Sequence, residues 1–584
     1  MLSHVPAVFI NMNDNWMRKY SLLFGFLFLA EWIFACITTD TIPVLSYEAR
    51  LQQGIDSASD AESEMSYRNA FALLDGLFEA YPDSVDVRGF YEAAILAARL
   101  AQTDKAFKYL TPLVDSECDH GPGWEFFIGK YWDDAFEVLE TDVRWKALVV
   151  RARRNKTDFY RLLQEEQNEF FNVKPELETL LGRSELSGTE LYAAIREYKG
   201  YLPKKKRDYS IAFDISDTVR TSYFVHLPES YDPSREYPLL VCLHGAVGYT
   251  QLEDFQVIGV LKDFNRFYTS CADRDEVILV FPAADKRYNW MKPDAGFFMV
   301  PEIVKQVKCA LHVDDDKVFV AGHSNGATGA FSYWMKQPSP FAGFFGFNTY
   351  PKVRTGGTFL LNGDNRFFVN FSTDQDYYYP PQANDTLDVL AHRLGLDYRD
   401  HRYNGYPHWF PAFDTSEVAF RIAFDEIKER RRNPFPDKVY RETDNVVYGR
   451  ADWLEITALD TLVPRADWHK TVNFPIHIWL NYNDDDELES KAVDRKAFDF
   501  PYASGAVKAT YKENRFNVWT SCVKSFRIYI SPEMVDMDKK VQVYVNGKLR
   551  YKGKVDWDDV FLKKLFLKTV DRKQLWVGCI DVGL

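Results

Sequence analysis

Apolar residues recur at intervals of three and four from about Ser46 to Lys199, and the alternation typical of β-strands is scarce there. Such spacing puts apolar side chains on one face of a helix. The sequence therefore predicts an N-terminal helical region, residues 46–200. We expect this region to serve packing or contact with a partner protein, and not catalysis.

The helical region contains a candidate repeat. The same spacing of alanine and leucine occurs twice, at Ala70, Leu74 and Leu77 and again at Ala106, Leu110 and Leu113. The layout is similar to tetratricopeptide repeats, in which helix pairs stack on one another. Two units are equally compatible with a plain helical bundle, so both interpretations stay open.

A different pattern begins after Tyr201-Leu202-Pro203, where short β-like runs alternate with longer helical stretches. Tyr237 to Leu243 and Val277 to Phe281 are continuous apolar runs, as expected of parallel strands that are covered on both faces. Alternating β and α elements predict an α/β fold with a right-handed arrangement over residues 205–433.

The last part of the chain, residues 440–584, is predicted to be a β-rich accessory domain. Phe526 to Ile530 and Val541 to Val545 are strand-like, and Asn546-Gly547 is the signal for a two-residue hairpin turn. With 584 residues the chain has room for several domains. The formal charge of −14 argues against a generic nucleic-acid binder, because phosphate contacts need a concentrated basic face.

The opening of the chain, residues 1–36, has the pattern of an export signal. Met17-Arg18-Lys19 is basic, Leu22 to Ala30 is apolar but too short to span a bilayer, and Ile33-Phe34-Ala35-Cys36 ends it. Met17 is a candidate start. The last four residues of this segment, Ile33 to Cys36, resemble a bacterial lipobox, which predicts a lipid anchor at Cys36. Ordinary cleavage near Ala35 is the alternative. We expect a periplasmic, outer-surface or extracellular protein.

A candidate nucleophile lies in Gly322-His323-Ser324-Asn325-Gly326, which follows an apolar strand and precedes a helix-compatible segment, Ala327 to Lys336. A serine on a sharp strand-to-helix turn needs small neighbours two positions away on each side. The start of the helix also favours an anionic oxygen. The pattern predicts that Ser324 is a catalytic nucleophile.

A serine hydroxyl needs a histidine base and an acid that orients it, in the chain order serine, acid, histidine. His408 follows the last predicted strand, from which a loop can carry the imidazole back over the sheet. Two carboxylates, Asp374 and Asp376, follow the preceding strand. The pattern alone leaves both open.

A turn after an early core strand, His244-Gly245-Ala246, is the candidate oxyanion hole. We expect the backbone N–H of Ala246 and that of Asn325 to be its donors. His244 is interpreted as structural in this turn and not as a second base.

Together these residues resemble the secreted α/β-hydrolase esterases, which include feruloyl and acetylxylan esterases and polyhydroxybutyrate depolymerases. The resemblance covers about residues 210–430 and also involves Tyr231-Asp232-Pro233 and Val313-Asp314. It implies a triad of Ser324, Asp376 and His408, because in the acid loop of such esterases a proline follows the acid within a few residues. One departure is that Gly326 is followed by Ala327 and not by a second glycine.

The resemblance implies an exported serine esterase that acts on a small or polymer-linked ester. A serine peptidase on the same fold and an inactive binding or scaffold lipoprotein are the alternatives. Trp290, Tyr377 to Tyr379 and Trp409 are candidates to line an acyl or aryl pocket, although in a chain with 16% aromatic residues a chance cluster is the favoured interpretation. No cofactor or metal is implied, since the sequence has no metal-ligand cluster and no phosphate-cradling glycine loop.

Overall fold

This computed structural model describes residues 46–584, apart from residues 85, 120, 175–178, 180, 183–185, 293–295, 380 and 484–486. The predicted export segment, with Met17 and Cys36, lies outside the described residues. Contacts divide the chain into two compact units, one ending at Leu162 and one running from Leu163 to Leu584. Among the described residues, no helix has both the length and the apolarity required to cross a bilayer.

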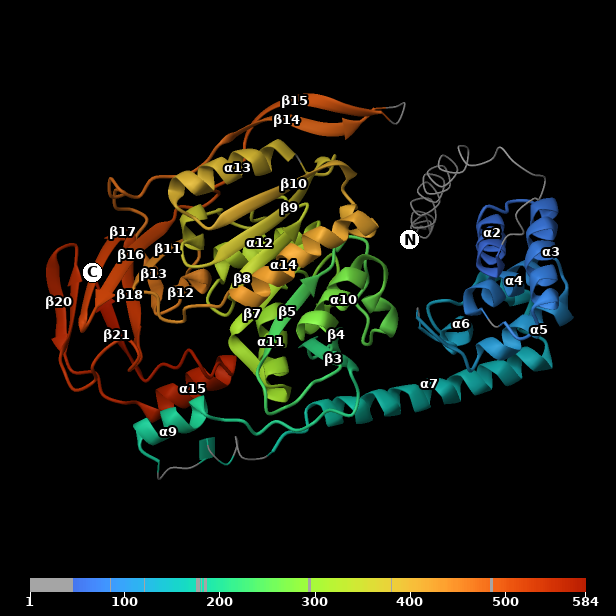
Figure 1. The fold of residues 1–584 in the computed structure, drawn as a ribbon, viewed down its shortest axis with the longest axis horizontal. Coiled ribbons are helices and arrows are strands. Elements are labelled where there is room, and N and C mark those ends of the chain that lie inside the picture. Colours follow the sequence, from blue (N-terminus) through green and yellow to red (C-terminus); the bar gives the residue numbers. More distant parts are fainter. Residues whose placement is uncertain are drawn as a thin grey trace, which may run out of the picture. The chain divides into compact units, whose positions relative to one another are not determined.

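The first unit is helical, as predicted, and consecutive helices pack on one another (Figure 1). Side-chain oxygens of Ser46, Ser63 and Asp86 accept N–H groups of the first turns of the helices that they precede. The repeat stays a prediction. The elements are α2 (Tyr47–Ser59), α3 (Glu64–Ala80), α4 (Val87–Arg99), α5 (Thr103–Leu113), β1 (Glu117–Cys118), β2 (Gly121–Pro122), α6 (Glu125–Ile128), η1 (Asp134–Leu139) and α7 (Val143–Phe170), which continues into the second unit.

The second unit is built around an eight-stranded sheet, which confirms the predicted α/β class. Its order is β10-β9-β8-β7-β5-β6-β4-β3, with β3 and β4 antiparallel to their neighbours and the other pairs parallel. The strands are β3 (Asp208–Ser216), β4 (Val219–His226), β5 (Tyr237–Leu243), β6 (Ile278–Pro282), β7 (Val313–His323), β8 (Gly343–Phe347), β9 (Phe367–Gln375) and β10 (Tyr398–Pro407).

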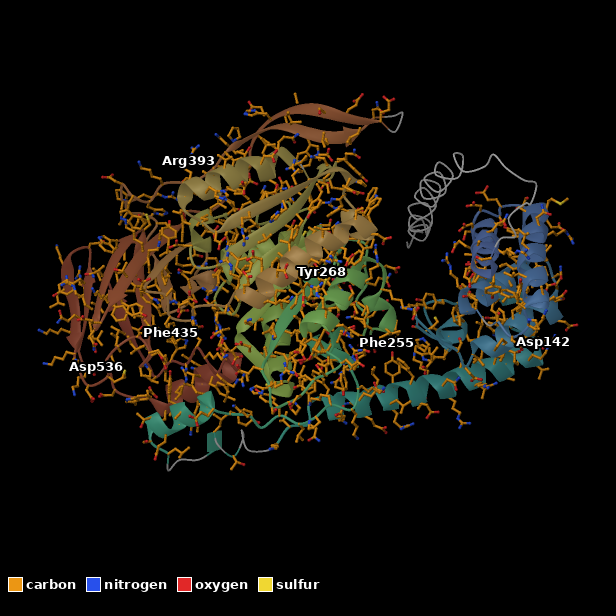
Figure 2. The ribbon with its side chains drawn as sticks, in the orientation of Figure 1. Asp142, Phe255, Tyr268, Arg393, Phe435 and Asp536 are labelled. Atoms are coloured by element: carbon orange, nitrogen blue, oxygen red, sulfur yellow. The ribbon has the colours of Figure 1, made fainter. Side chains whose placement is uncertain are left out.

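Helices cover both faces of this sheet. Along β5, Leu239 and Val241 join one core with α11, α12 and α13, whereas Leu240 and Cys242 join the opposite core with α10 and α14. Tyr268 of α10, labelled in Figure 2, is buried in that second core. The helices are α10 (Arg266–Asp275), α11 (Met299–Ala310), α12 (Asn325–Lys336), α13 (Pro381–Leu394) and α14 (Glu417–Glu429). Because these strands are parallel, the loops that leave their carboxyl ends share one edge of the sheet.

The C-terminal part of this unit is β-rich and forms two sheets with a shared apolar core. One sheet contains β11 (Lys438–Thr443), β16 (Gly505–Lys512), β17 (Arg515–Ser521), β19 (Val541–Val545) and β20 (Lys548–Gly553). The other contains β12 (Arg450–Ala451), β13 (Leu454–Leu459), β18 (Val523–Ile530) and β21 (Gly578–Gly583). A separate hairpin, β14 (Pro475–Tyr482) with β15 (Leu488–Lys496), runs beside α13 (Figure 1).

Helix α9 (Gly188–Arg196) packs on the late helix α15 (Asp559–Thr569), through Leu191 and Ile195 against Leu562 and Phe566. The predicted N-terminal helical region, residues 46–200, includes this helix. The predicted boundaries of 46–200, 205–433 and 440–584 stay predictions.

A buried network of charges joins the α/β part to the β-rich part. Asp571 lies 2.9 Å from Arg432 and 3.5 Å from Lys308, and Lys308 lies 3.0 Å from Asp315. Arg572 lies 3.0 Å from the second carboxylate oxygen of Asp315. Each of these side chains is at most 5% exposed. Charges removed from water in this way require their partners, so each part supplies the other's counter-ions.

The β-rich part also caps the helix that follows Ser324. Arg441 of β11 is fully buried and donates to the carbonyl oxygens of Met335 (2.9 Å) and Lys336 at the end of α12. It also donates to the carbonyl of Tyr448 at 2.8 Å. The last carbonyls of a helix have no partner within the helix, and a cation there suits the helix dipole.

Candidate active site

Ser324 sits at the junction of β7 and α12 in a strained backbone conformation. Its φ is 56° and its ψ is −117°, a region that costs a non-glycine residue about 1–3 kcal/mol. The flanking glycines make the turn possible. A Cβ on Gly326 would lie 1.9 Å from the carbonyl oxygen of Leu243, and one on Gly322 would lie 2.3 Å from the carbonyl carbon of Gly326. The glycines of the motif are thus required by packing.

The imidazole of His408 lies between Ser324 and Asp376. Its Nε2 is 2.7 Å from Oγ of Ser324, and its Nδ1 is 2.8 Å from Oδ1 of Asp376. Nδ1 and the carboxylate are close but are not aligned as a hydrogen bond. Such bonds often tighten only when substrate is bound. The structure therefore brings the three predicted side chains together at the sheet edge.

The second candidate carboxylate points elsewhere. Asp374 accepts the backbone N–H of Gly405 at 2.8 Å. Asp376 is buried, and its Oδ1 accepts the N–H groups of Tyr378 and Tyr379, each at 3.0 Å. Two backbone donors therefore fix the orientation of this carboxylate.

The loop that carries His408 is held by side chains that the sequence did not single out. The carbonyl oxygen of His408 accepts from Nε2 of His323 at 2.7 Å and from Nδ2 of Asn348 at 2.6 Å. Thr373 donates to the carbonyl of Pro407 at 3.3 Å. These three residues lie at the ends of β7, β8 and β9 or just beyond them. In the sequence, these residues could have been found as polar residues at the ends of buried strands.

His323 is neutral in this position. Because a carbonyl oxygen can only accept, Nε2 of His323 must carry the proton of that ring. Desolvation, and secondarily the proximity of His408, lowers the pKa of His323 to about 3. The ring therefore serves as a fixed donor across the neutral pH range.

The predicted oxyanion turn lies against the nucleophile. A Cβ on Gly245 would come within 3.1 Å of Cβ of Ser324. Ala246 has a φ of 53°, in the left-handed region that turns use. Among the described residues, neither the N–H of Ala246 nor that of Asn325 donates to a protein acceptor.

His244 orients this turn. Its Nδ1 lies 2.7 Å from the carbonyl oxygen of Gly245, and its Nε2 accepts the N–H of Ala284 at 3.1 Å. Burial lowers the pKa of His244, so the ring stays neutral and Nδ1 is the donor. In a trans peptide the C=O and the N–H point in opposite directions. Holding the Gly245 carbonyl therefore directs the N–H of Ala246 away from His244, which agrees with the structural role that the sequence suggested.

The comparison with known proteins bears on the nucleophile region. Residues 219–350 match the protein-family model Esterase, described as "Putative esterase". The matched segment holds the oxyanion turn and Ser324 and ends before Asp376 and His408. The chain is a serine hydrolase. No curated protein sequence matches this hydrolase.

Several solved structures are similar to part of this hydrolase. A thermostable esterase is 18% identical, with 39% of this chain and 64% of that chain covered and a TM-score of 0.32. FphF, a fluorophosphonate-binding serine hydrolase of Staphylococcus aureus, is 14% identical, with 38% and 99% covered and a TM-score of 0.29. A ferulic acid esterase is 16% identical, with 38% and 99% covered and a TM-score of 0.31.

Aromatic side chains surround the imidazole of the hydrolase. The rings of Tyr378 and Tyr379 lie 4.7 and 5.3 Å from that of His408, and Tyr377 lies 6.0 Å from Trp409. Tyr378 is 38% exposed and therefore open to a ligand. Trp290, one of the candidate pocket residues from the sequence, does not line this surface. It is 1% exposed because it packs beneath His244 and against Gly329, where a Cβ would approach it to 2.3 Å.

A second serine–histidine–carboxylate set lies in the β-rich part of the hydrolase. His469 lies 2.9 Å from Oγ of Ser521 through Nδ1 and 2.8 Å from Oε1 of Glu442 through Nε2. All three are at most 6% exposed, and Oγ of Ser521 also accepts the N–H of Ala466 at 3.0 Å. Substrate has no access to this serine, so the set acts as a buried polar network that stabilises the fold.

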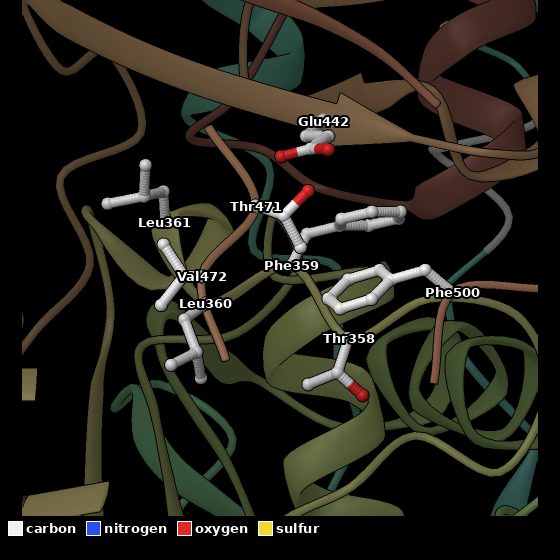
Figure 3. Close-up of a pocket in the computed structure, with 8 residues that line it drawn as sticks. All are labelled: Thr358, Phe359, Leu360, Leu361, Glu442, Thr471, Val472 and Phe500. Carbon is white, nitrogen blue, oxygen red and sulfur yellow. The ribbon is translucent and has the colours of Figure 1, made fainter. Parts of the chain in front are cut away.

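A cavity of about 10 Å³ lies beside Glu442. Figure 3 shows Thr471 and the rings of Phe359 and Phe500 around it. This is room for about one water molecule. None of its lining residues belongs to the site around Ser324. Within the described residues, no group of three or more His, Cys, Asp or Glu side chains is arranged to hold a metal ion.

Proposed function

We propose that this serine hydrolase is an exported esterase that forms an acyl-enzyme on Ser324, with His408 as base and Asp376 as orienting acid. The observation that carries the proposal is the pair of contacts of His408, 2.7 Å to the hydroxyl and 2.8 Å to the carboxylate. Both are distances at which a proton can be accepted and an imidazolium stabilised.

In acylation, Oγ of Ser324 attacks the ester carbonyl carbon while its proton passes to Nε2 of His408. The carbonyl oxygen becomes an oxyanion, for which the N–H groups of Ala246 and Asn325 are the proposed donors. The intermediate then collapses, the bond to the alcohol breaks, and the alcohol oxygen takes the proton from Nε2. Asp376 keeps the imidazole in the required tautomer and balances its positive charge without taking the proton.

Deacylation repeats these steps with water. His408 removes a proton from the water as its oxygen attacks the acyl carbon, and the second tetrahedral intermediate releases the acid. The proton on Nε2 returns to Oγ of Ser324. Every proton is thus accounted for by one imidazole, without any other group.

We propose a carboxylic ester, on a small molecule or on a polymer, as the substrate. The exposed ring of Tyr378 beside His408 suits an acyl or aryl group, because aromatic faces pack well on apolar and planar ligands. Short acyl esters, feruloyl esters and acetylated sugars are the classes to compare. Preferential turnover of a peptide bond would favour the peptidase alternative instead.

Labelling with a fluorophosphonate tests the proposal, since this reagent reacts with an activated serine. We expect labelling of the folded protein that is lost in Ser324→Ala, together with hydrolysis of at least one of the three ester classes. Folded protein that neither labels nor hydrolyses any ester would support the inactive binding protein.

We further propose that the segment from Met17 to Cys36 directs export, with lipid attached at Cys36. Support comes from the basic, apolar and small-residue order of the segment. Metabolic labelling with a fatty acid, compared between the natural chain and Cys36→Ser, tests the anchor. Cleavage near Ala35 without lipid would leave export intact and overturn lipidation.

A further inference from the structure

The side chain of Asn325, the residue after the nucleophile, connects two loops of the candidate site. Its Oδ1 accepts the backbone N–H of Val247 at 3.2 Å, and its Nδ2 donates to the hydroxyl oxygen of Tyr379 at 2.9 Å. A backbone N–H can only donate, so the orientation of the carboxamide is fixed by this pair of contacts.

The first of these contacts holds the oxyanion turn. Val247 follows Ala246, whose left-handed φ of 53° has to be maintained by its surroundings. The side chain of Val247 is buried in the core of the sheet, while its N–H is engaged by Asn325. The turn is thus fixed on the core side and on the side of the nucleophile, and the N–H of Val247 is withdrawn from any ligand.

The second contact holds the acid loop. The N–H of Tyr379 donates to Oδ1 of Asp376 at 3.0 Å, and its ring packs edge-on against the imidazole of His408, 5.3 Å away. A side chain that fixes the hydroxyl of Tyr379 therefore fixes the residue that supports both the carboxylate and the imidazole.

We propose that Asn325 is a positioning residue. Its carboxamide sets how far the oxyanion turn and the acid loop lie from Ser324. This inference rests on the proposed esterase function and adds to it a role for the side chain, separate from that of the backbone N–H. The side chain acts through Val247 and Tyr379 and does not touch the reacting atoms. Its loss therefore lowers turnover more than substrate binding.

Kinetics of Asn325→Ala and Tyr379→Phe, alone and combined, test this role. We expect Asn325→Ala to lower kcat roughly ten- to a hundredfold with KM changed less than about threefold, since misplacement by about 1 Å can cost a hundredfold. Tyr379→Phe removes only one of the two contacts and should lose less. The double variant should be about as slow as Asn325→Ala, because both changes break the same link.

Asn514→Ala is the matched control. In the β-rich part, the half-buried carboxamide of Asn514 donates to the carbonyl of Asp536 at 2.7 Å and accepts the N–H of that residue at 3.0 Å. Its loss removes the same kind of double contact away from the site. We expect reduced stability and unchanged kcat for this control.

The outcomes separate this inference from the proposed function. If the natural protein neither hydrolyses esters nor labels with fluorophosphonate, the esterase function is wrong. If the natural protein is active and Asn325→Ala keeps kcat within about threefold while its thermal midpoint falls as in Asn514→Ala, the carboxamide is only structural and the inference is overturned. Strictly additive losses in the double variant would also contradict a single link.

Discussion

Asp376 and His408 meet at 2.8 Å, although they lie on two different loops and His408 is also held through its own carbonyl oxygen. Asp374, two positions earlier, is occupied by the N–H of Gly405. We therefore expect Asp376→Asn to lower kcat by about 10³–10⁴-fold, because the wrong imidazole tautomer is then favoured. Asp374→Asn keeps an acceptor for Gly405 and should retain most turnover. Steady-state kinetics of the two variants decide between them, and the reverse ranking would contradict the assignment.

The turn at Ser324 depends on the absence of a side chain at Gly326. In Gly326→Ala the new Cβ would meet the carbonyl oxygen of Leu243 at 1.9 Å, and the other near atoms are also backbone, of Leu243 and His244, so no side chain can rotate to make room. We expect hydrolysis to fall more than about a hundredfold because the nucleophile moves. Gly76→Ala in α3 is the control, since nothing lies within 4 Å of its new Cβ. It should leave turnover unchanged and raise stability by about 0.5–1 kcal/mol.

The buried charges at Asp571 predict a large effect on stability. Asp571→Asn leaves Lys308 and Arg432 buried without one of their carboxylates. Breaking a buried pair typically costs about 3–5 kcal/mol in the free energy of unfolding. Asp581, which pairs with Arg527 at 2.8 Å and is 62% exposed, is the matched control. Asp581→Asn should cost about 0–1 kcal/mol. Urea unfolding of both variants measures the difference, and equal losses would count against the network.

The lowered pKa of His323 predicts acid sensitivity. Its pKa is about 3 in the folded protein and about 6.5 in the unfolded chain, so the unfolded state binds more protons between these values. The contribution of His323 to stability is full above pH 6.5 and is lost as the pH falls toward 3. His323→Gln keeps a donor but removes the titration. The free energy of unfolding, measured between pH 7 and pH 5, should fall less steeply in this variant than in the natural protein. Parallel pH profiles would contradict the prediction.

The sequence predicted the strands that have a clear hydrophobic pattern, either a continuous apolar run or an alternation. Tyr237 to Leu243 and Val541 to Val545 coincide with β5 and β19. It missed β8, because Gly343 and Gly346 have low strand propensity. The structure explains these glycines. A Cβ at Gly343 would lie 2.1 Å from the ring of Phe367, and one at Gly346 would lie 2.0 Å from Oγ1 of Thr349. Only the assembled sheet creates that requirement.

The candidate site likewise combines a signal that is local in the sequence with contacts that only the fold creates. Ser324 carries a local signal, a strand followed by a turn and a helix, that can be read without the fold. The hydrogen bonds from His323 and Asn348 to the carbonyl of His408 depend on how three strand ends are aligned, which the sequence does not encode locally. The choice between Asp374 and Asp376 likewise depends on where one loop turns.

The shared ion network between the α/β part and the β-rich part has an evolutionary consequence. A lineage that lost residues 434–584 would lose Asp571 and Arg572, and with them one ion-pair partner each of Lys308, Arg432 and Asp315. Arg441 at the end of α12 adds a fourth dependency. The two parts are therefore expected to descend together, with substitutions that covary across their boundary, rather than to be shuffled among other proteins.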